Sequence, residues 1–427
     1  MRAMTLVVLW IVALASPASA QERCVVVHGG SVHFVDGTRE GTVTFRGARI
    51  TDLAEPAVSE GCERIDASGK VVTAGLIESF SALGLTEVDL ERVTVDHSPG
   101  GALAGRPVRA SFAVADAYNP RSTLIAISRM GGITSAVIAP NGGLISGQSA
   151  FVDLLGDTQS TTIQKRLVAV QAHLGGGGGS RSDGLSGLRN LFSEARVYRD
   201  KGEEWRRMRY RGFETPIREL KAMQSVIAGQ TPMAVHVDRA SDIEALLKLT
   251  ADGPSPVRLI LVGGAEAWIH AKELAKRKIP VLVDPLLESP ESFDRIASRA
   301  DNAKLLHEAG VSVMFSTFWT HNMRTLAQVA GNAVRAGLDK RAALDAITRV
   351  PAEAFGLSDH GSLVIGKRAN LVIWSGDPLE VSSAPERIFI GGEDAPLISR
   401  QTRLYERYRE LPGTPQPPLP LPTKRTP

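Results

Sequence analysis

Three side chains that could carry proton-transfer chemistry lie in, at the end of or just after apolar stretches in the second half of the chain. His236 lies inside one such stretch, Asp284 ends a second, and His321 follows a third. Because side chains alternate along a strand, His236 should point to the opposite face from Val235 and Val237. A histidine with an orienting carboxylate forms a common general base. The pattern therefore makes His236, Asp284 and His321 the candidate catalytic residues.

Each of these residues also has a purely structural interpretation. His236 could be a hydrogen-bonded core histidine. Asp284 precedes Pro285 and could cap a turn, and His321 with Asn322 could cap the helix that begins there. Both interpretations stay open at this point, because spacing in sequence does not establish proximity.

A second group of candidates could contact a ligand. Glu78, Ser79 and Phe80 come at the far end of an apolar, β-prone stretch that begins at Val71, and Trp319 follows another such stretch. Polar groups fix the orientation of a ligand, and aromatic rings line most small-molecule pockets. We therefore predict that Glu78, Ser79, Phe80 and Trp319 bind substrate.

The middle of the chain, residues 71–357, alternates apolar stretches with segments of helical periodicity. This alternation is typical of a parallel α/β fold. The expected strands are Thr134–Ile138, Met233–Asp238, Arg258–Val262, Pro280–Asp284 and Val311–Ser316. The expected helices are Ala240–Leu249, Glu266–Lys276, Ser292–Ala309, Asn322–Ala336 and Lys340–Arg349. The ends of such strands would place the candidate side chains on one rim.

The start of the chain predicts export. Met1–Ala20 has a basic start, a short apolar centre and a small-residue cleavage site, which is the pattern of a signal peptide. The mature protein is thus expected in the periplasm or outside the cell, with no membrane span after cleavage. Cys24 and Cys62 either form a disulfide there or remain free thiols. The proline-rich residues 411–427 should be a disordered tail.

Composition restricts the classes of partner. Charged residues make up 22% of the 427 residues, hydrophobic residues make up 43%, and the formal net charge is only +3. This balance is ordinary for a globular protein and gives no reason to expect nucleic acid or an anionic membrane as a partner. The expected partner is a small-molecule ligand. A homo-oligomer is left open.

The segment RIDASGKVVTAGLIESFSALG resembles the amidohydrolase motif IDAxGxxVxPGxIDxHxH, and GSLVIGKRANLVIWSGDPL resembles the closing motif of that superfamily. Further segments, such as GGITSAVIAPNGGLISGQSAFVDL, resemble an exported, imidazolonepropionase-like branch. The resemblance implies a (β/α)₈ TIM-like barrel over residues 71–357. It also implies a small composite β-sandwich built from residues 21–70 and 358–400.

The resemblance also implies a metal site, of which His236 matches the fifth-strand ligand. Other expected ligand positions hold different residues, namely Phe80 and Ala82 on the first strand, Gly263 and Gly264 on the sixth, and Phe318 and Trp319 on the eighth. Trp319 is expected to fill the volume where a metal and its water would lie. A single histidine holds zinc weakly, so no metal cofactor is expected. Zinc or another divalent metal would be the cofactor if the site were functional.

Two hypotheses follow for function. By resemblance, the chain is an amidohydrolase-type enzyme whose ancestral activity is hydrolysis of non-peptide C–N bonds in cyclic amides or related small molecules, with a degenerate metal site. The alternative is a metal-free pseudoenzyme that binds a small molecule or a protein in the periplasm. Fold alone does not decide between them.

Overall fold

The computed structural model describes residues 22–54, 61–100, 105–175, 180–207, 212–251, 257–286 and 289–409. The expected signal peptide and proline-rich tail lie outside these residues. Across the part of the chain that is described, no helix has both the length and the apolar character needed to cross a bilayer.

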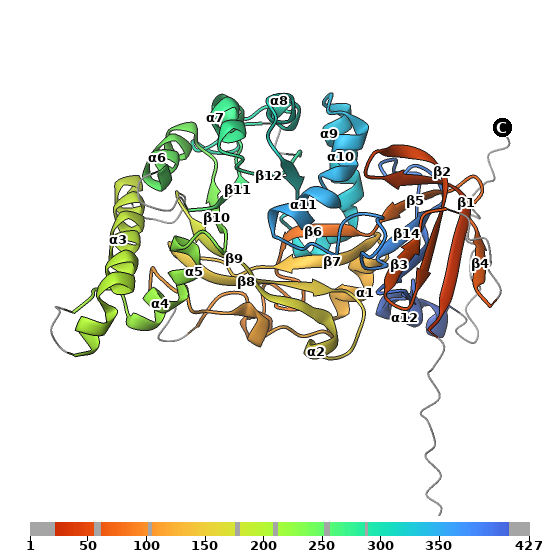
Figure 1. The fold of residues 1–427 in the computed structure, drawn as a ribbon, viewed down its shortest axis with the longest axis horizontal. Helices are drawn as coiled ribbons and strands as arrows, with labels where there is room; N and C mark the ends of the chain where they lie inside the picture. Colours follow the sequence, from red (N-terminus) through yellow and green to blue (C-terminus); the bar gives the residue numbers. More distant parts are fainter. Residues whose placement is uncertain are drawn as a thin grey trace, which may run out of the picture.

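One sheet of eight strands forms the body of the molecule (Figure 1). In spatial order its strands are β6 (Leu76–Ser81), β7 (Ile133–Ile138), β8 (Ile145–Asp153), β9 (Ile163–His173), β10 (Met233–Val237), β11 (Leu259–Gly263), β12 (Val281–Val283) and β13 (Val313–Phe315). The sheet is a nearly closed barrel, so the α/β barrel expected from the sequence is present. The five strands expected in this region correspond to β7, β10, β11, β12 and β13.

The barrel departs from the strict (β/α)₈ pattern at β8. This strand pairs antiparallel with both β7 and β9, whereas the other neighbours pair in parallel. A short turn joins β7 to β8, and it contains Gly142 and Gly143, both with positive φ angles. A turn of this length can connect antiparallel strands, while a parallel pair needs a longer crossover. The prediction of eight uniform β/α units was therefore wrong at this strand.

The first and last barrel strands, β6 and β13, are not neighbours in the hydrogen-bonded path of the sheet. A later segment of the chain bridges them. Ile77 of β6 donates its backbone N–H to the carbonyl of Ile347 at 2.8 Å, and Phe315 of β13 donates to that of Ala346 at 3.1 Å. We call this junction of β6 and β13 the seam, and it lies beside the candidate site.

Helices follow most of the parallel strands and cover the barrel. The α-helices are α1 (Thr123–Arg129), α2 (Gln159–Thr162), α3 (Arg181–Arg206), α4 (Ile217–Ala222), α5 (Gln224–Ile227), α6 (Ala240–Ala251), α7 (Ala271–Lys276), α8 (Asn302–Glu308), α9 (Leu326–Arg335), α10 (Lys340–Asp345), α11 (Arg349–Ala354) and α12 (Arg400–Tyr408). Short 3₁₀ helices are η1 (Arg92–Thr94), η3 (Val114–Asp116), η4 (Ala267–His270) and η5 (Thr320–Thr325).

The prediction of a helix over Ser292–Ala309 was wrong for its first half. In this segment α8 is the α-helix, and it covers only the second half. Two side chains of this segment bind elsewhere instead of pointing away from a helix. Asp294 forms an ion pair with Arg181, and Arg295 forms one with Asp238. These contacts hold the segment across the rim of the barrel, where tertiary interactions outweigh helical propensity.

Both ends of the chain contribute to a second sheet, seen at one end of the molecule in Figure 1. It contains β1 (Cys24–Phe34), β2 (Gly37–Arg46), β3 (Arg49–Asp52), β4 (Glu63–Asp66), β5 (Val71–Ala74), β14 (Leu371–Trp374), β15 (Pro385–Ile390) and β16 (Glu393–Asp394). The antiparallel pair of β5 and β14 joins the two ends. By hydrogen-bond pairing the described strands form one branched sheet, and the expected two-layer sandwich stays a prediction.

Asp153, at the end of β8, ties the barrel to the C-terminal segment. It is buried, and its Oδ1 accepts hydrogen bonds from Ser135 Oγ at 2.7 Å and Asn370 Nδ2 at 3.1 Å. Its carboxylate also lies within ion-pair distance of Arg368 Nε at 2.7 Å and His360 Nε2 at 3.3 Å. One buried carboxylate thus connects β7, β8 and the segment 360–370.

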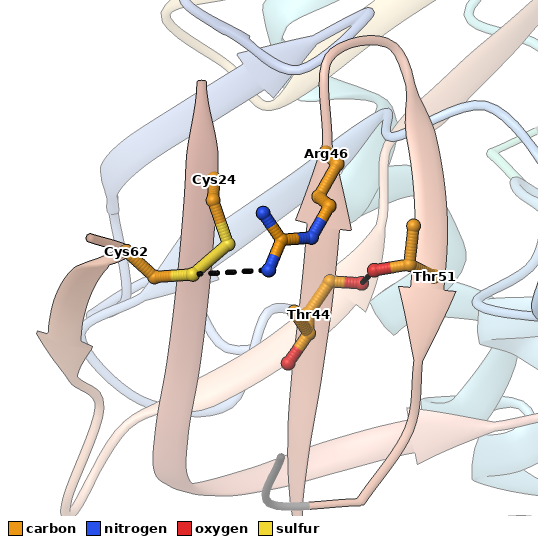
Figure 2. The surroundings of a disulfide bond; sticks show 5 residues. All are labelled: Cys24, Thr44, Arg46, Thr51 and Cys62. Atoms are coloured by element: carbon orange, nitrogen blue, oxygen red, sulfur yellow. Dashed lines mark hydrogen bonds between the residues drawn. A yellow bond between two sulfur atoms is a disulfide. The ribbon is translucent and has the colours of Figure 1, made fainter. Parts of the chain in front are cut away.

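Cys24 and Cys62 form a disulfide, which decides between the two alternatives left open by the sequence (Figure 2). The parallel pairing of β1 with β4 brings the two residues together, and their Cα atoms are 4.6 Å apart. Arg46 on β2 donates from Nη2 to Cys62 Sγ at 3.8 Å. The bond therefore links the start of β1 to the residue that precedes β4.

Reduction of this disulfide should lower the free energy of unfolding by about 3–4 kcal/mol, because the bond closes a loop of 38 residues in the unfolded chain. Urea unfolding with and without reductant measures the change. The double variant Cys24→Ser, Cys62→Ser is the control, since its midpoint should not respond to reductant. Equal midpoints for oxidised and reduced wild-type protein would contradict the prediction.

Candidate functional site

A cavity of about 340 Å³, which we call the rim cavity, opens at the carboxyl ends of strands β9 to β12. Its lining includes His173, His236, Asp238, Asp242, Asp284, Asp294, Arg295 and Phe318. A larger cavity of about 460 Å³ lies near the opposite ends of the strands, beside Pro232, Pro280 and Ser312. We place the candidate site in the smaller cavity, because the carboxyl ends of barrel strands carry the chemistry and this cavity gathers histidines and carboxylates.

Two histidines stack face to face on the wall of this cavity. His173 ends β9 and pairs in register with His236 on β10, so their side chains leave the sheet on the same side. The ring centroids are 4.0 Å apart and the ring planes differ by 8°. Phe80 contacts the His236 ring edge-on at 4.7 Å between centroids. The His236 ring thus contacts both an imidazole and a phenyl ring.

The hydrogen bonds of the two rings differ. Nδ1 of His173 lies 2.9 Å from Ser146 Oγ and is hydrogen-bonded to it. Nε2 of His236 is buried and has no hydrogen-bond partner among the described residues. A buried nitrogen without a partner is costly and needs an explanation, such as a bound molecule.

Both imidazoles are neutral at physiological pH. Burial lowers the pKa of His173 to about 4, with the charge of Arg109 adding to the effect. Burial also lowers the pKa of His236 well below its usual value, and His173 adds to it. Desolvation disfavours the charged form of histidine, and each further cation nearby does the same.

The carboxylates of the cavity differ in their partners. Asp238 accepts a hydrogen bond from Arg295 Nε at 2.8 Å, and Asp242 accepts one from Arg181 Nε at 2.9 Å. Asp284 accepts only the backbone N–H of Leu286, at 2.9 Å. Burial raises the pKa of Asp284 above its usual value. Among the described residues, Asp284 therefore forms no ion pair, although the charge of Arg295 acts against this rise in its pKa.

Glu78 is fully buried at the seam and is not part of the cavity lining. Its Oε2 accepts hydrogen bonds from Thr317 N at 3.2 Å and Thr317 Oγ1 at 3.1 Å, and its Oε1 accepts one from Phe80 N at 3.2 Å. Burial raises the pKa of Glu78 to about 7, although these donors act in the opposite direction. Its observed contacts join β6 to the end of β13.

Trp319 does not fill the centre of the site, because 59% of it is exposed to solvent. Phe318 lines the cavity instead, with its ring centroid 5.8 Å from that of Phe80. The backbone of Phe318 adopts a positive φ of 50°, which turns the chain at the end of β13. The prediction that Trp319 fills the site was therefore wrong, and its neighbour Phe318 lines the cavity. Ser79 is buried, is not part of the lining, and its Oγ has no partner in the described structure.

The structure brings His236 and Asp284 to one cavity and leaves His321 outside its lining. The Nε2 atom of His321 is hydrogen-bonded to the carbonyl of Glu87 at 3.1 Å, and its Nδ1 lies 3.5 Å from Asp89 Oδ2. These contacts hold His321 against the loop that follows β6. The expected partnership of His321 with His236 is thus not formed.

Sequence reasoning missed His173 and Arg295. His173 ends the run LVAVQAH, which begins with four consecutive apolar residues. That run carries the strand signal that identified Met233–Asp238, so treating it as a strand would have found the residue. Arg295 carried no such signal, because it lies in a segment that was interpreted as a helix.

The side chains present do not fit the metal that barrels of this kind commonly hold. The ring-nitrogen lone pairs of two parallel imidazoles lie in parallel planes, so they do not converge on one ion at about 2.0–2.1 Å. Among the residues that the structure describes, no three His, Cys, Asp or Glu side chains are grouped closely enough to hold a metal ion.

Comparison with known proteins identifies related sequences and folds. The model of the amidohydrolase family matches residues 304–388. The amidohydrolase tasK of Hapsidospora irregularis is 26% identical over 198 residues, which are 42% of this chain and 19% of that protein. The chain thus matches about a fifth of the length of this curated relative.

Solved structures share the fold. The amidohydrolase from Thermotoga maritima MSB8 has a TM-score of 0.78 and 24% sequence identity, over 88% of this chain and 100% of that one. Molinate hydrolase has a TM-score of 0.53 and 17% identity, over 88% and 95% of the two chains. These likenesses establish the fold, and residues 304–388 are similar to the amidohydrolase family.

Proposed function

We propose that this protein is an amidohydrolase-superfamily barrel that binds a small molecule in the rim cavity without a resident metal ion. The observation that carries the proposal is the parallel stack of His173 on His236. Phe80, at a position where the resembling motif has a histidine, also contacts the His236 ring but is not part of the cavity lining. The two imidazole rings therefore form a wall suited to contacting a ligand, with ring nitrogens that can donate or accept hydrogen bonds.

Elemental analysis of the purified protein tests this proposal. We expect well under one equivalent of zinc, iron or manganese, and an unchanged melting temperature after treatment with a chelator, because the donor set cannot enclose an ion. His236→Ala should leave the metal content as low as in the wild type. His321→Ala, which alters a histidine outside the cavity, is the matched control. A stoichiometric metal that is lost in His236→Ala but kept in His321→Ala would refute the proposal.

Hydrolysis of C–N bonds in cyclic amides is the competing function, favoured by the match to the amidohydrolase family and by the hydrolases that share the fold. An assay with five- and six-membered cyclic amides, with and without added zinc, separates the two functions. We expect no turnover above that of His236→Ala. Turnover that is lost in this variant would instead establish the hydrolase function.

We further propose that the protein belongs to the exported branch that the sequence resembles and works in the periplasm. The Cys24–Cys62 disulfide supports this location, since such bonds persist in oxidising compartments. Fractionation of the cells that produce the protein tests it, and a reduced protein found in the cytosol would contradict it.

A further inference from the structure

The charges of the rim cavity allow its ligand to be described more closely, and this inference rests on the proposed small-molecule function. We infer that the ligand is a small organic cation, of the ammonium or amidinium class, whose positive charge lies against Asp284. The ligand should also carry an apolar or planar body.

Carboxylates outnumber their cationic partners in this cavity. Arg295 forms an ion pair with Asp238, while Arg181 is shared by Asp242 and Asp294. A further cation of the lining, Arg239, is exposed, so water and salt screen its charge. Four carboxylates are thus balanced chiefly by two guanidinium groups, and the cavity has an excess of negative charge.

Asp284 is the carboxylate of the lining that forms no ion pair with any described residue. Within the described part of the chain, no Lys, Arg or His nitrogen lies within ion-pair distance of it, and its Oδ1 accepts only the Leu286 N–H. The residue is partly buried at the end of β12, where it lines the cavity. A partly desolvated carboxylate is stabilised by a cation that reaches it, and the cavity is the route by which a ligand does so.

The remaining walls fit a cation with an apolar body. His173 and His236 line the cavity with ring nitrogens that can hydrogen-bond a ligand, and His236 Nε2 has no partner among the described residues. Phe318 supplies an apolar wall, and its left-handed backbone holds it in place. Non-glycine residues in that conformation are uncommon and concentrate at functional sites. An anion would instead meet the unpaired charge of Asp284.

Three probes of nearly the same shape test this inference, namely benzamidinium, neutral benzamide and the anion benzoate. Titration calorimetry at pH 7.5 should show benzamidinium binding at least about tenfold more tightly than benzamide, and no binding of benzoate, because only the first can pair with Asp284. D284N should reduce the affinity for benzamidinium to that for benzamide. D157N, which removes an exposed carboxylate outside the cavity lining, should keep the full preference.

Equal affinities for the three probes, or a preference that survives in D284N, would overturn the inference. If D284N does not fold, the wild-type ranking decides together with NMR shifts of the His173 and His236 ring protons. The expected ranking with these shifts supports the inference, and any other ranking, or no shifts, overturns it. Stoichiometric metal with the expected ranking would refute only the proposed function, whereas a metal-free protein with another ranking would refute only the ligand class.

Discussion

Replacing Asp153 by alanine will lower the free energy of unfolding by roughly 3–5 kcal/mol, the largest loss that we expect from a single substitution in this protein. The carboxylate accepts hydrogen bonds from Ser135 and Asn370 and lies beside Arg368 and His360. Without it, a partly buried guanidinium group and several buried polar atoms lose their partner. Urea unfolding followed by circular dichroism measures the loss.

Two further variants show whether the buried network is responsible. Asp157→Ala removes an exposed aspartate from the turn that follows β8, and it should change stability by less than about 0.5 kcal/mol. Asp153→Asn keeps an acceptor oxygen but removes the charge, so its loss should lie between the two. If Asp153→Ala proves as stable as Asp157→Ala, the network does not hold the barrel to the C-terminal segment.

Glu78 should make the protein less stable as the pH rises. Its pKa is about 7 in the folded state and 4.5 as the ordinary value, so the folded state binds the proton more tightly. The stabilisation of the folded state by the proton on Glu78 is therefore complete below pH 4.5. It is lost between about pH 4.5 and 7 and stays lost above pH 7. The shift corresponds to roughly 3 kcal/mol. Because glutamine cannot ionise, the free energy of unfolding of Glu78→Gln should rise by about this much relative to that of the wild type across this pH range.

The difference in unfolding free energy between Glu78→Gln and the wild type, measured from pH 4 to pH 8.5, isolates this group from other titrating residues. Ser79→Ala is the control, because Ser79 is an equally buried neighbour on β6 that does not ionise. Its difference from the wild type should be independent of pH. A pH-independent difference for Glu78→Gln as well would show that the carboxyl group is solvated in the folded protein.

The sequence by itself determined most of the barrel and one half of the site. The strands predicted at Met233–Asp238 and Pro280–Asp284 have ends that agree with those of β10 and β12 to within one residue. In these strands the local pattern and the tertiary environment favour the same structure. Parallel strands end on a common rim, so a histidine on one strand and an aspartate at the end of another could be expected to meet there. His236 and Asp284 do line one cavity.

Other features were decided by the tertiary structure. The antiparallel direction of β8 depends on a short glycine turn, which a repeating β/α pattern does not reveal. Likewise, a single positive φ at Phe318 turns that ring toward the cavity, while Trp319 is largely exposed. The backbone conformation of one residue thus decides which of two adjacent aromatic side chains faces the cavity. Local sequence preferences do not predict that conformation.

The histidine stack shows the same limit most clearly. His173 and His236 are 63 positions apart in the sequence, and each could have been a core residue on its own. They stack because β9 and β10 pair in one particular register, and a shift of that register by one residue would place them on opposite faces. Register is determined by how all the strands pack together around the barrel core. The sequence therefore determined which residues could reach the rim, while the packing of the strands decided which of them meet.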